Sequence, residues 1–372
     1  MVITFDLPYF PRDGLLQEVL RVFESGLKQG VTLFAPRRQG KTSFVKHELL
    51  PAAHEFGWRT FYVDLWKRRG DPELGLVEAL EAFVEQRQGG LRRKLRLKEV
   101  KGKAKAPGVG VEAILEPTAR RPDDSLENRL DAALSALVKD GVTLLVLDEV
   151  QALAGARRED FVAALRTVLQ KFQGKLLVFY TGSSREQLNA MFRKQKAPLF
   201  ASAMPVQLPE LHDDFVVDRL AFLAQRSAVA VSKTDFLQAF DDLGRTPEFF
   251  NELVLHLIIA GDGNVSKALE AWQSAHREAG AGAVLDELRP IELAVMHLLA
   301  MRDHPSVYSA DGVAFVEQWT SDAGKVTPAR IQTVINKLMK LDLVAPTGKV
   351  AGDYEIDDRA ILIQLRKAQL PL

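Results

Sequence analysis

The feature that most constrains this chain is a loop sequence that directly follows a short apolar run. The run Val31–Phe34 leads into the segment Ala35–Ser43, which reads APRRQGKTS. The segment matches the pattern G-x-x-x-x-G-K-[ST] at every defined position except the first, where the residue is Ala35. Run and pattern together predict a buried strand, a tight loop and then a helix, expected from Lys41 to Leu50.

The chemistry of such a loop is the binding of a polyphosphate. Backbone N–H groups surround the phosphates, the lysine reaches the outer ones, and the hydroxyl that follows holds Mg²⁺. We expect Gly40 to allow close backbone approach, Lys41 to supply the charge and Thr42 to hold the metal. The positive end of the following helix dipole would face the same anion. The other residues predicted to contact the nucleotide are Arg37, Arg38, Gln39, Ser43 and, more remotely, Arg12.

Alternatives stay open for the loop motif and for Arg12. Ala35 makes the loop a variant, because alanine disfavours a left-handed backbone. Taken alone, the motif could also be a chance match in a strand-turn-helix unit. Arg12 precedes an amphipathic helix and is predicted either to cap the neighbourhood of that helix or to contact the nucleotide.

A second motif supports the nucleotide interpretation. The apolar run Val142–Leu147, typical of a central parallel strand, ends in Asp148 and Glu149. Ligands of open α/β sheets bind at the carboxyl ends of the strands, and buried carboxylates need a cation or water to meet them. We therefore expect Asp148 to hold Mg²⁺ through a water, and Glu149 to polarise an attacking water.

A third strand is predicted from Lys175 to Tyr180, and polar residues follow it. Thr181 is the first choice, and Ser183 the second, for a hydrogen bond to the attacking water or to the γ-phosphate. The alternative is a strand that simply ends in turn-forming residues.

Length and composition limit the remaining possibilities. A chain of 372 residues suggests two or three domains. With 49 basic and 49 acidic residues its net charge is zero, so no overall electrostatic attraction draws it to nucleic acid. It has no cysteine, which excludes disulfides and thiolate chemistry. The seven histidines show no ligand spacing. Residues 1–11 do not resemble a signal peptide and no apolar run is long enough to cross a bilayer, so we expect a cytoplasmic protein without a membrane partner.

One segment departs from this neutral balance. From Arg87 to Lys105 the chain carries nine basic residues against one acid. We predict a projecting hairpin or flexible insertion over residues 87–116, with a short strand near 108–115. Such a charge run is usually a solvated face, but it is also the best candidate for contact with a DNA backbone. The candidate DNA contacts in it are Arg92, Arg93, Lys94 and Arg96.

The loop segment, the strand end Leu147–Gln151 and the strand end Thr181–Ser184 resemble the archaeal-type P-loop ATPases of the AAA+/STAND (ASCE) superfamily. The resemblance covers nearly the whole chain. It implies an α/β core whose parallel sheet has an extra strand between the phosphate-loop strand and the acidic strand. A helical lid and a C-terminal winged helix-turn-helix domain would follow. It also implies ATP and Mg²⁺ as cofactors, and the residues that would take the family's roles are Lys41, Thr42, Asp148, Glu149 and Thr181.

Two arginine positions depend on the same resemblance. The segment Gly244–Pro247 resembles the Gly-x-Pro element at the base of the lid, with one extra residue, which makes Arg245 a candidate sensor of the γ-phosphate. Family members often have an arginine shortly after a Pro-Leu-aromatic stretch, but here alanine and serine follow Phe200. Arg185 and Arg193 are weaker candidates for a charge supplied to another subunit.

The pattern of the C-terminal third predicts several short helices. After a linker expected at residues 279–282, helices are predicted at 290–301, 310–319 and 327–341, followed by a short hairpin. The third helix would enter the DNA major groove, with Arg330 and Lys337 facing outward. Its buried stripe is expected to consist of Ile331, Val334, Ile335, Leu338 and Leu341. Ten basic and ten acidic residues between Leu288 and Leu372 provide no strong positive face. DNA contact and, for the same fold, protein interaction or packing against the lid are therefore equal alternatives.

These observations predict three parts: a core at 1–208, a lid at 209–282 and a winged helix at 283–372. We expect a Mg²⁺-dependent ATPase whose nucleotide state switches conformation and controls engagement of double-stranded DNA or a partner protein. The alternative is a nucleotide-gated DNA-binding or scaffold module with little intrinsic hydrolysis. A homo-oligomer is compatible with either.

Overall fold

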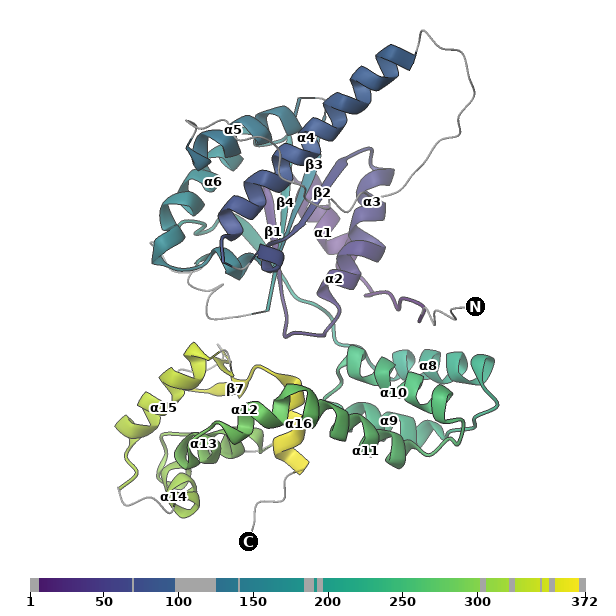
Figure 1. Cartoon of the computed structure of the whole chain (residues 1–372), viewed down its shortest axis with the longest axis vertical. Coiled ribbons are helices and arrows are strands. Elements are labelled where there is room, and N and C mark those ends of the chain that lie inside the picture. The colour runs from purple at the N-terminus through teal and green to yellow at the C-terminus, as the bar shows by residue number, and fades with distance from the viewer. Residues whose placement is uncertain are drawn as a thin grey trace.

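A parallel sheet forms the centre of the computed structural model (Figure 1). The strands are β1 (Gly30–Phe34), β2 (Arg59–Asp64), β3 (Thr143–Asp148), β4 (Leu176–Gly182) and β5 (Ala203–Val206). Their order is β2-β3-β4-β1-β5, and each neighbouring pair is parallel. Strand β4 therefore lies between the phosphate-loop strand and the acidic strand, as the resemblance implied. The structure describes residues 7–68, 70–97, 125–139, 141–183, 191–192, 197–301, 306–320, 325–341, 343–347 and 352–367.

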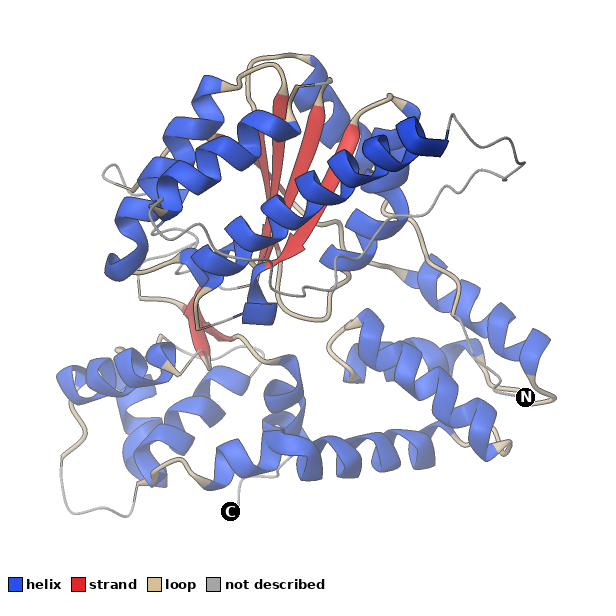
Figure 2. Ribbon diagram, turned by 45° about the horizontal axis from the view of Figure 1, so that its top comes forward, coloured by secondary structure: helices blue, strands red, loops and turns tan. Residues whose placement is uncertain are grey.

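Helices cover both faces of the sheet (Figure 2). One face is packed by α1 (Leu15–Glu24), α2 (Lys41–Phe44), the π-helical turn η1 (Val45–Leu49) and α3 (Leu50–Glu55). The other face is packed by α4 (Pro72–Leu97), α5 (Leu126–Leu137) and α6 (Glu159–Lys171). The short 3₁₀ turns η2 (Leu65–Arg68), η3 (Val150–Leu153) and η4 (Ala156–Arg158) link strands to helices.

Side-chain alternation along β3 explains why this strand is apolar on both faces. Leu144 and Val146 belong to the cluster under α1 and α3, whereas Leu145 and Leu147 belong to the cluster under α4, α5 and α6. Successive side chains of a strand point to opposite faces, so a strand covered on both sides needs apolar residues throughout. The charged end of β3 is therefore the exception that marks the sheet edge.

Four helices follow the sheet and form a separate hydrophobic cluster, which we call the lid. They are α8 (Asp213–Arg226), α9 (Lys233–Asp242), α10 (Pro247–Ala260) and α11 (Val265–His276). Their core is aromatic, with Phe236, Phe250 and Trp272 fully buried. Burial of such large rings stabilises a small helical unit by several kcal/mol, at roughly 25 cal/mol per Å² of apolar area.

The third cluster contains the helices and the hairpin of the C-terminal part of the chain, which we call the winged-helix domain after the form predicted for it. The elements are α13 (Pro290–Ala300), α14 (Ala310–Trp319), α15 (Pro328–Lys340), β6 (Val344–Pro346), β7 (Tyr354–Ile356) and α16 (Arg359–Lys367). Strands β6 and β7 pair antiparallel and form the wing. The final helix α16 was not anticipated, and its Ala360 and Ile363 join the lid cluster, so lid and winged helix share a seam.

Three local expectations from the sequence are wrong. The linker expected at 279–282 is instead a kink between helical segments, because η5 (Arg277–Ala281) and α12 (Gly282–Asp286) continue from α11 and the non-helical backbone inside η5 is at Gly280, whose φ is 145°. Leu341, placed in the buried stripe of α15, is exposed. The basic segment begins as helix rather than hairpin, because α4 runs to Leu97.

The side chains of residues 88–97 and the whole of 98–116, including the strand predicted near 108–115, lie outside the described residues. Among the helices that the structure describes, none is long and apolar enough to cross a membrane.

Candidate functional site

The loop Ala35–Gly40 turns through two left-handed residues before α2 begins. These are Arg38, with φ of 65°, and Gly40, with φ of 94°. Ala35 is not among the residues with positive φ, which explains how alanine is accepted at the first motif position. The glycine that the backbone requires is Gly40, because a Cβ there would also lie 3.0 Å from Nη2 of Arg12.

Lys41 is buried at the start of α2. Its Nζ donates hydrogen bonds to the carbonyl oxygens of Ala35 at 2.7 Å and Pro36 at 2.9 Å. Burial lowers the pKa of Lys41, although the carboxylates of Glu149 and Asp148 oppose that shift. A buried ammonium whose bonds go to neutral oxygens is poorly compensated, and an anion would improve its environment.

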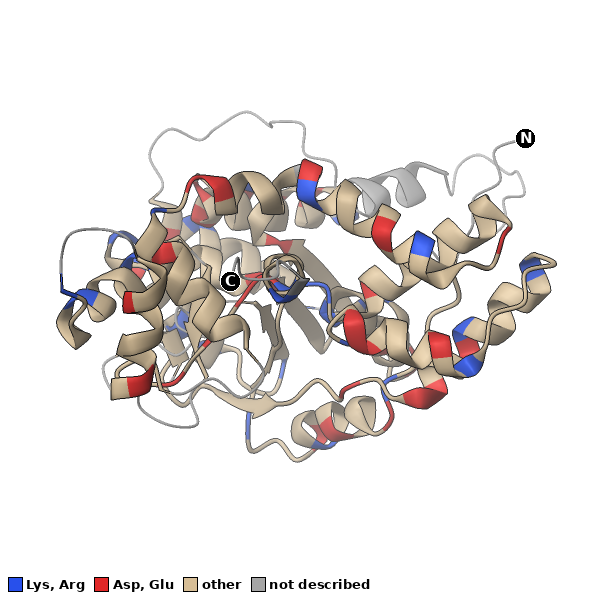
Figure 3. Cartoon of the chain, turned by 90° about the horizontal axis from the view of Figure 1, so that it is seen from below, with Lys and Arg blue, Asp and Glu red and all other residues tan. Residues whose placement is uncertain are grey.

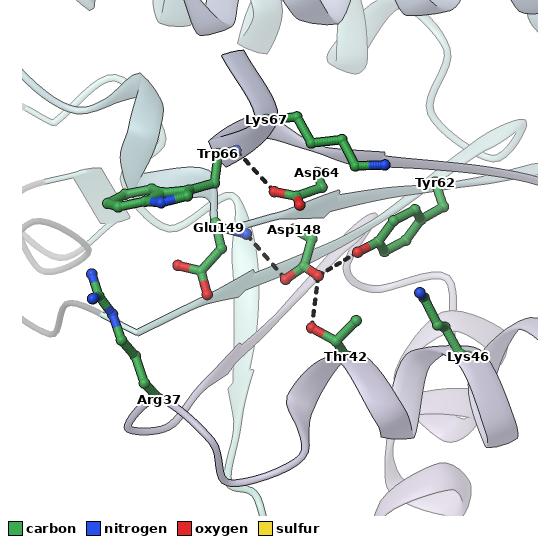
Figure 4. A pocket seen from close by; sticks show the side chains of 9 residues that line it. All are labelled: Arg37, Thr42, Lys46, Tyr62, Asp64, Trp66, Lys67, Asp148 and Glu149. Atoms are coloured by element: carbon green, nitrogen blue, oxygen red, sulfur yellow. Dashed lines mark hydrogen bonds between the residues drawn. The ribbon is translucent and has the colours of Figure 1, made fainter. Parts of the chain in front are cut away.

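The Asp148 carboxylate is the best-connected group of the site (Figure 4). Its Oδ2 accepts hydrogen bonds from Thr42 Oγ1 at 2.9 Å and from Tyr62 Oη at 2.6 Å. Its Oδ1 accepts from Thr181 Oγ1 and from the backbone N–H of Glu149. Side chains from α2, β2 and β4 thus meet at the end of β3, where the motifs predicted a shared site.

Glu149 occupies a strained backbone position immediately after β3. Its φ is 56°, in the left-handed region that costs a non-glycine residue about 1–3 kcal/mol. Its carboxylate accepts hydrogen bonds from Gln151 Nε2 and from Ser183 Oγ. Such strain is retained where the surrounding structure fixes it, and here it turns the carboxylate into the pocket.

The two hydroxyls at the end of β4 contact different carboxylates. Thr181, the first choice from the sequence, holds the Asp148 carboxylate and accepts from the Glu149 N–H at 3.3 Å. Ser183, the second choice, donates to Glu149 at 3.0 Å. Gln151 had no predicted role, yet it is buried and contacts both Glu149 and Ser183.

A pocket of about 370 Å³ opens beside these groups, on the β2 side of the loop. Figure 4 shows the Glu149 carboxylate turned toward Arg37 and the Thr42 hydroxyl below Asp148. The lining residues are Arg37, Thr42, Lys46, Tyr62, Asp64, Trp66, Lys67, Asp148 and Glu149. Five of them were not predicted as site residues: Lys46, Tyr62, Asp64, Trp66 and Lys67.

The register of β2 explains why Tyr62 and Asp64 reach this pocket. Asp64 pairs with Asp148 and Tyr62 with Val146, so all four side chains share one face. Burial raises the pKa of Asp64 above its usual range, and a nearby Asp148 raises it further. Burial and the Asp148 carboxylate also raise the pKa of Tyr62. An acid at the end of β2 was the sequence signal that could have identified Asp64.

Arg12 supports the loop rather than lining the pocket. Its guanidinium donates to the Gln39 carbonyl oxygen and, at 2.6 Å, to the Pro209 carbonyl oxygen. Its backbone N–H donates to Glu48 Oε1 at 2.8 Å. The side chain is buried, and burial lowers its pKa. Arg12 thereby ties the loop to the start of the lid, which favours the supporting role over direct contact.

The other predicted loop residues differ in their contacts. The Arg37 guanidinium lies 5.3 Å from the centre of the Trp66 ring, at the pocket rim. Arg38 points away, toward the first turn of α10, where it lies 3.6 Å from Glu248 and 4.9 Å from the centre of the Phe249 ring. Ser43 is exposed on α2.

Arg245 is engaged inside the lid. It donates to Asp241 Oδ1 at 3.1 Å and lies 3.8 Å from Asp213 and 5.2 Å from the centre of the Phe240 ring. Arg245 does not line the pocket, so its role as a γ-phosphate sensor remains a prediction. Arg185 and Arg193 lie outside the described residues.

The predicted DNA contacts also have different positions. Lys337 is exposed, as predicted, but it donates to both oxygens of the buried Glu292, at 2.9 and 3.0 Å, so a carboxylate of its own domain already pairs with its charge. Arg330 is half-buried in the first turn of α15. The side chains of Arg92, Arg93, Lys94 and Arg96 lie outside the described residues. Figure 3 shows basic and acidic residues interspersed over the lid and winged helix.

Comparison with known proteins supports this architecture. The chain is similar in structure to a Walker-type ATPase of Pyrococcus abyssi, with 17% identity over 96% of both chains and a TM-score of 0.65. It is also similar to the ORC2 protein of Aeropyrum pernix, solved as ADPNP-ADP complexes, with 17% identity over 97% of both chains and a TM-score of 0.55.

A third similar structure is the Aeropyrum pernix ORC1 protein in complex with DNA, at 15% identity over 97% of this chain and 92% of that one, with a TM-score of 0.50. No protein-family model and no curated protein sequence matches the chain. The fold of archaeal P-loop ATPases, predicted from the motifs, is confirmed by these likenesses.

Proposed function

We propose that this protein is a Mg²⁺-dependent ATPase whose nucleotide state switches its conformation. The observation that carries the proposal is the meeting of Thr42 and Asp148, 2.9 Å apart, beside the buried Lys41 and the strained Glu149. A hydroxyl, a carboxylate and a lysine at a helix start are the groups that P-loop enzymes use for a nucleotide triphosphate. Similar structures that bind ADPNP and ADP support nucleotide binding here.

The residues present fit a bound magnesium ion. Mg²⁺ prefers oxygen ligands and is usually held by one or two protein groups together with phosphates and water. Within the described residues no cluster of three or more His, Asp or Glu is arranged to hold a metal alone. Thr42 and Asp148 would therefore hold the ion together with the nucleotide. When bound, Mg²⁺ would neutralise charge on the phosphates.

The chain's own groups would perform the remaining steps. Lys41 would attract the phosphates, and the N–H groups at the start of α2 would orient them. Glu149 would accept a hydrogen bond from a water and take its proton as that water attacks the γ-phosphate, while the bond from the γ-phosphorus to the bridging oxygen breaks and ADP leaves. Ser183 and Gln151, which hold the Glu149 carboxylate, would fix the direction of that water.

Contacts between the three parts support the switching role. Arg38 joins the phosphate loop to α10 of the lid through Glu248 and Phe249. The side chain of Arg359, at the start of α16, passes 4.0 Å from the position of a Cβ on Gly244 at the base of the lid. Asp357, just after β7, lies close enough to Lys41 to raise its pKa against burial. Phosphates bound at the loop would therefore change the electrostatic interactions of Arg38 with the lid and of Lys41 with Asp357 in the winged-helix domain.

The output of the switch would be engagement of double-stranded DNA or of a partner protein. The similar ORC1 structure contains DNA, which supports the first. The alternative function is a nucleotide-gated DNA-binding or scaffold module with little hydrolysis, with a missing charge supplied by a homo-oligomer or partner. The engagement of Arg245 by Asp241 and Asp213 favours this alternative, because that arginine would first have to leave its lid partners.

Nucleotide binding by Lys41→Ala tests the proposal. The variant should lose ATP affinity by about 100-fold or more, because a buried charge-assisted contact contributes about 3 kcal/mol. Calorimetry with ATP and Mg²⁺ measures the loss. The matched control is Lys28→Ala, which also removes a lysine bonded to a carbonyl oxygen, that of Ala201, but at the opposite end of β1. Equal affinity of Lys41→Ala and wild type would end the proposal.

A further inference from the structure

Tyr62 provides a contact to the candidate metal ligand that belongs to none of the recognised motifs. Its hydroxyl donates to Asp148 Oδ2 at 2.6 Å, on the same oxygen that accepts from Thr42. The other donors to this carboxylate are Thr181 and the Glu149 N–H, both from motif segments. Strand β2 thus contributes a hydrogen bond to Asp148 from a side chain that the sequence patterns did not identify.

The sheet holds Tyr62 in place for this contact. Tyr62 pairs with Val146, two residues before Asp148 on the neighbouring strand, and lies on the same face. A tyrosine is long enough to reach such a diagonal neighbour. Its ring packs against the cluster under α1 and α3, and Lys46 Nζ lies 5.8 Å from the ring centre. Ring packing therefore fixes the direction of the hydroxyl.

The orientation of the Asp148 carboxylate depends on hydrogen-bond donors from the protein. The carboxylate is buried, and a buried carboxylate oxygen that loses a donor becomes costly and free to turn. Mutating a group that hydrogen-bonds and orients a metal ligand typically lowers metal affinity by about 10–100-fold. Tyr62 is suited to this task because its hydroxyl, held by the rigid sheet, donates its one proton to Asp148.

We infer that Tyr62 is a positioning residue that fixes the Asp148 carboxylate for Mg²⁺ and so couples the metal to nucleotide binding. The inference rests on the proposed function. It concerns the metal and not the affinity for ATP itself, because the phosphate contacts come from the loop and from Lys41. Removing the hydroxyl should therefore affect nucleotide binding only when Mg²⁺ is present.

The experiment is a titration of Mg²⁺ against a fluorescent ATP analogue bound to the full-length protein. Tyr62→Phe keeps the ring and removes the hydroxyl. It should raise the Mg²⁺ concentration that gives half of the metal-dependent tightening by about 10-fold, as for other residues that orient a metal ligand. Affinity for the analogue in EDTA should stay within about twofold of wild type, which is below 0.5 kcal/mol.

The matched control is Tyr180→Phe. Tyr180 is a buried tyrosine of β4, but it packs on the opposite face of the sheet against Phe192. This variant should leave the Mg²⁺ dependence unchanged. Thermal unfolding of both variants shows whether either loses structure. As a second measure, Mn²⁺ binding followed by electron paramagnetic resonance in the presence of ADP should weaken in Tyr62→Phe alone.

The outcomes separate the inference from the proposed function. A wild-type Mg²⁺ dependence that Tyr62→Phe retains unchanged would overturn the role of Tyr62 and leave the ATPase proposal standing. Equal weakening with and without Mg²⁺ would also overturn it, since that result indicates a general structural effect. If wild type itself fails to bind the analogue, the proposed function fails and the inference fails with it.

Discussion

The phosphate loop and the winged helix use their lysines in opposite ways. Lys41 is buried, and both of its hydrogen bonds go to neutral carbonyl oxygens. Lys337 lies on α15, where an outward-facing lysine suggested DNA contact, but it is bonded to both oxygens of Glu292. One lysine lacks a bonded carboxylate, and the other has one inside its own domain.

This difference teaches how to weigh a charged residue found by sequence. A cation that a carboxylate already satisfies has little electrostatic reason to contact a ligand, because bonding the ligand means losing that partner. A buried cation bonded only to neutral groups gains from an anion. The comparison therefore makes the loop the stronger candidate for ligand binding, and it weakens the case for Lys337 as a DNA contact.

The largest expected effect concerns the acids that face Lys41. Glu149→Gln should reduce ATP turnover by about 100-fold or more, because general-base catalysis contributes about 10²–10⁴-fold. ATP affinity should change little, since the amide keeps the shape of the side chain. Steady-state phosphate release and calorimetry measure the two quantities. Glu159→Gln, on the first turn of α6, is the matched control, and turnover of Glu149→Gln equal to wild type would contradict the assigned role.

A smaller effect is expected at the winged helix. Lys337→Ala should lower the free energy of unfolding by about 1–3 kcal/mol, because it removes one of the cations that serve a buried carboxylate, with Arg289 remaining. Lys340→Ala, exposed on the same helix, should change it by less than about 0.5 kcal/mol. Urea unfolding measures both variants.

The pH dependence sharpens the same test. Burial alone would raise the pKa of Glu292, but hydrogen bonds from Lys337 and Arg289 outweigh burial and lower it below the usual 4.5. Since the folded pKa is lower than the unfolded one, the pair stabilises the fold above pH 4.5 and loses this contribution as the pH falls further. Lys337→Ala should flatten that loss. If the variant instead keeps full stability and weakens duplex binding with a shallower salt dependence, Lys337 is a DNA contact after all.

The smallest effect is expected where the two regions meet. Asp357→Asn removes a negative charge of the winged-helix domain that faces Lys41, and it should tighten ATP binding by about threefold, as expected for charges separated by partly solvated space. The control is Asp353→Asn in the wing, where the Asp353 carboxylate accepts a hydrogen bond from Thr347. Unchanged ATP affinity in Asp357→Asn would show that the loop and the winged helix are electrostatically independent.

The sequence alone determined which residues meet at the core of the site. A glycine-lysine-threonine segment after one apolar run and two acids after another can meet only at the carboxyl edge of a parallel sheet. Local patterns therefore predicted that Lys41, Thr42, Asp148 and Thr181 converge. They also predicted the apolar stripe of α15, which the burial of Ile331, Val334, Ile335 and Leu338 confirms. Each of these features depends on short-range periodicity or on the chemistry of a few adjacent residues.

Only the tertiary structure decided which distant groups meet those residues. Tyr62 and Asp64 enter the pocket through the register of β2 against β3, and the buried Glu292 accepts a hydrogen bond from the exposed Lys337. Arg12 bridges the loop and the lid across 197 positions of sequence. Such pairings follow from packing of segments far apart in the chain, and no local pattern encodes a partner at that separation. For this reason the motifs located the site, whereas the fold determined how its charges are balanced.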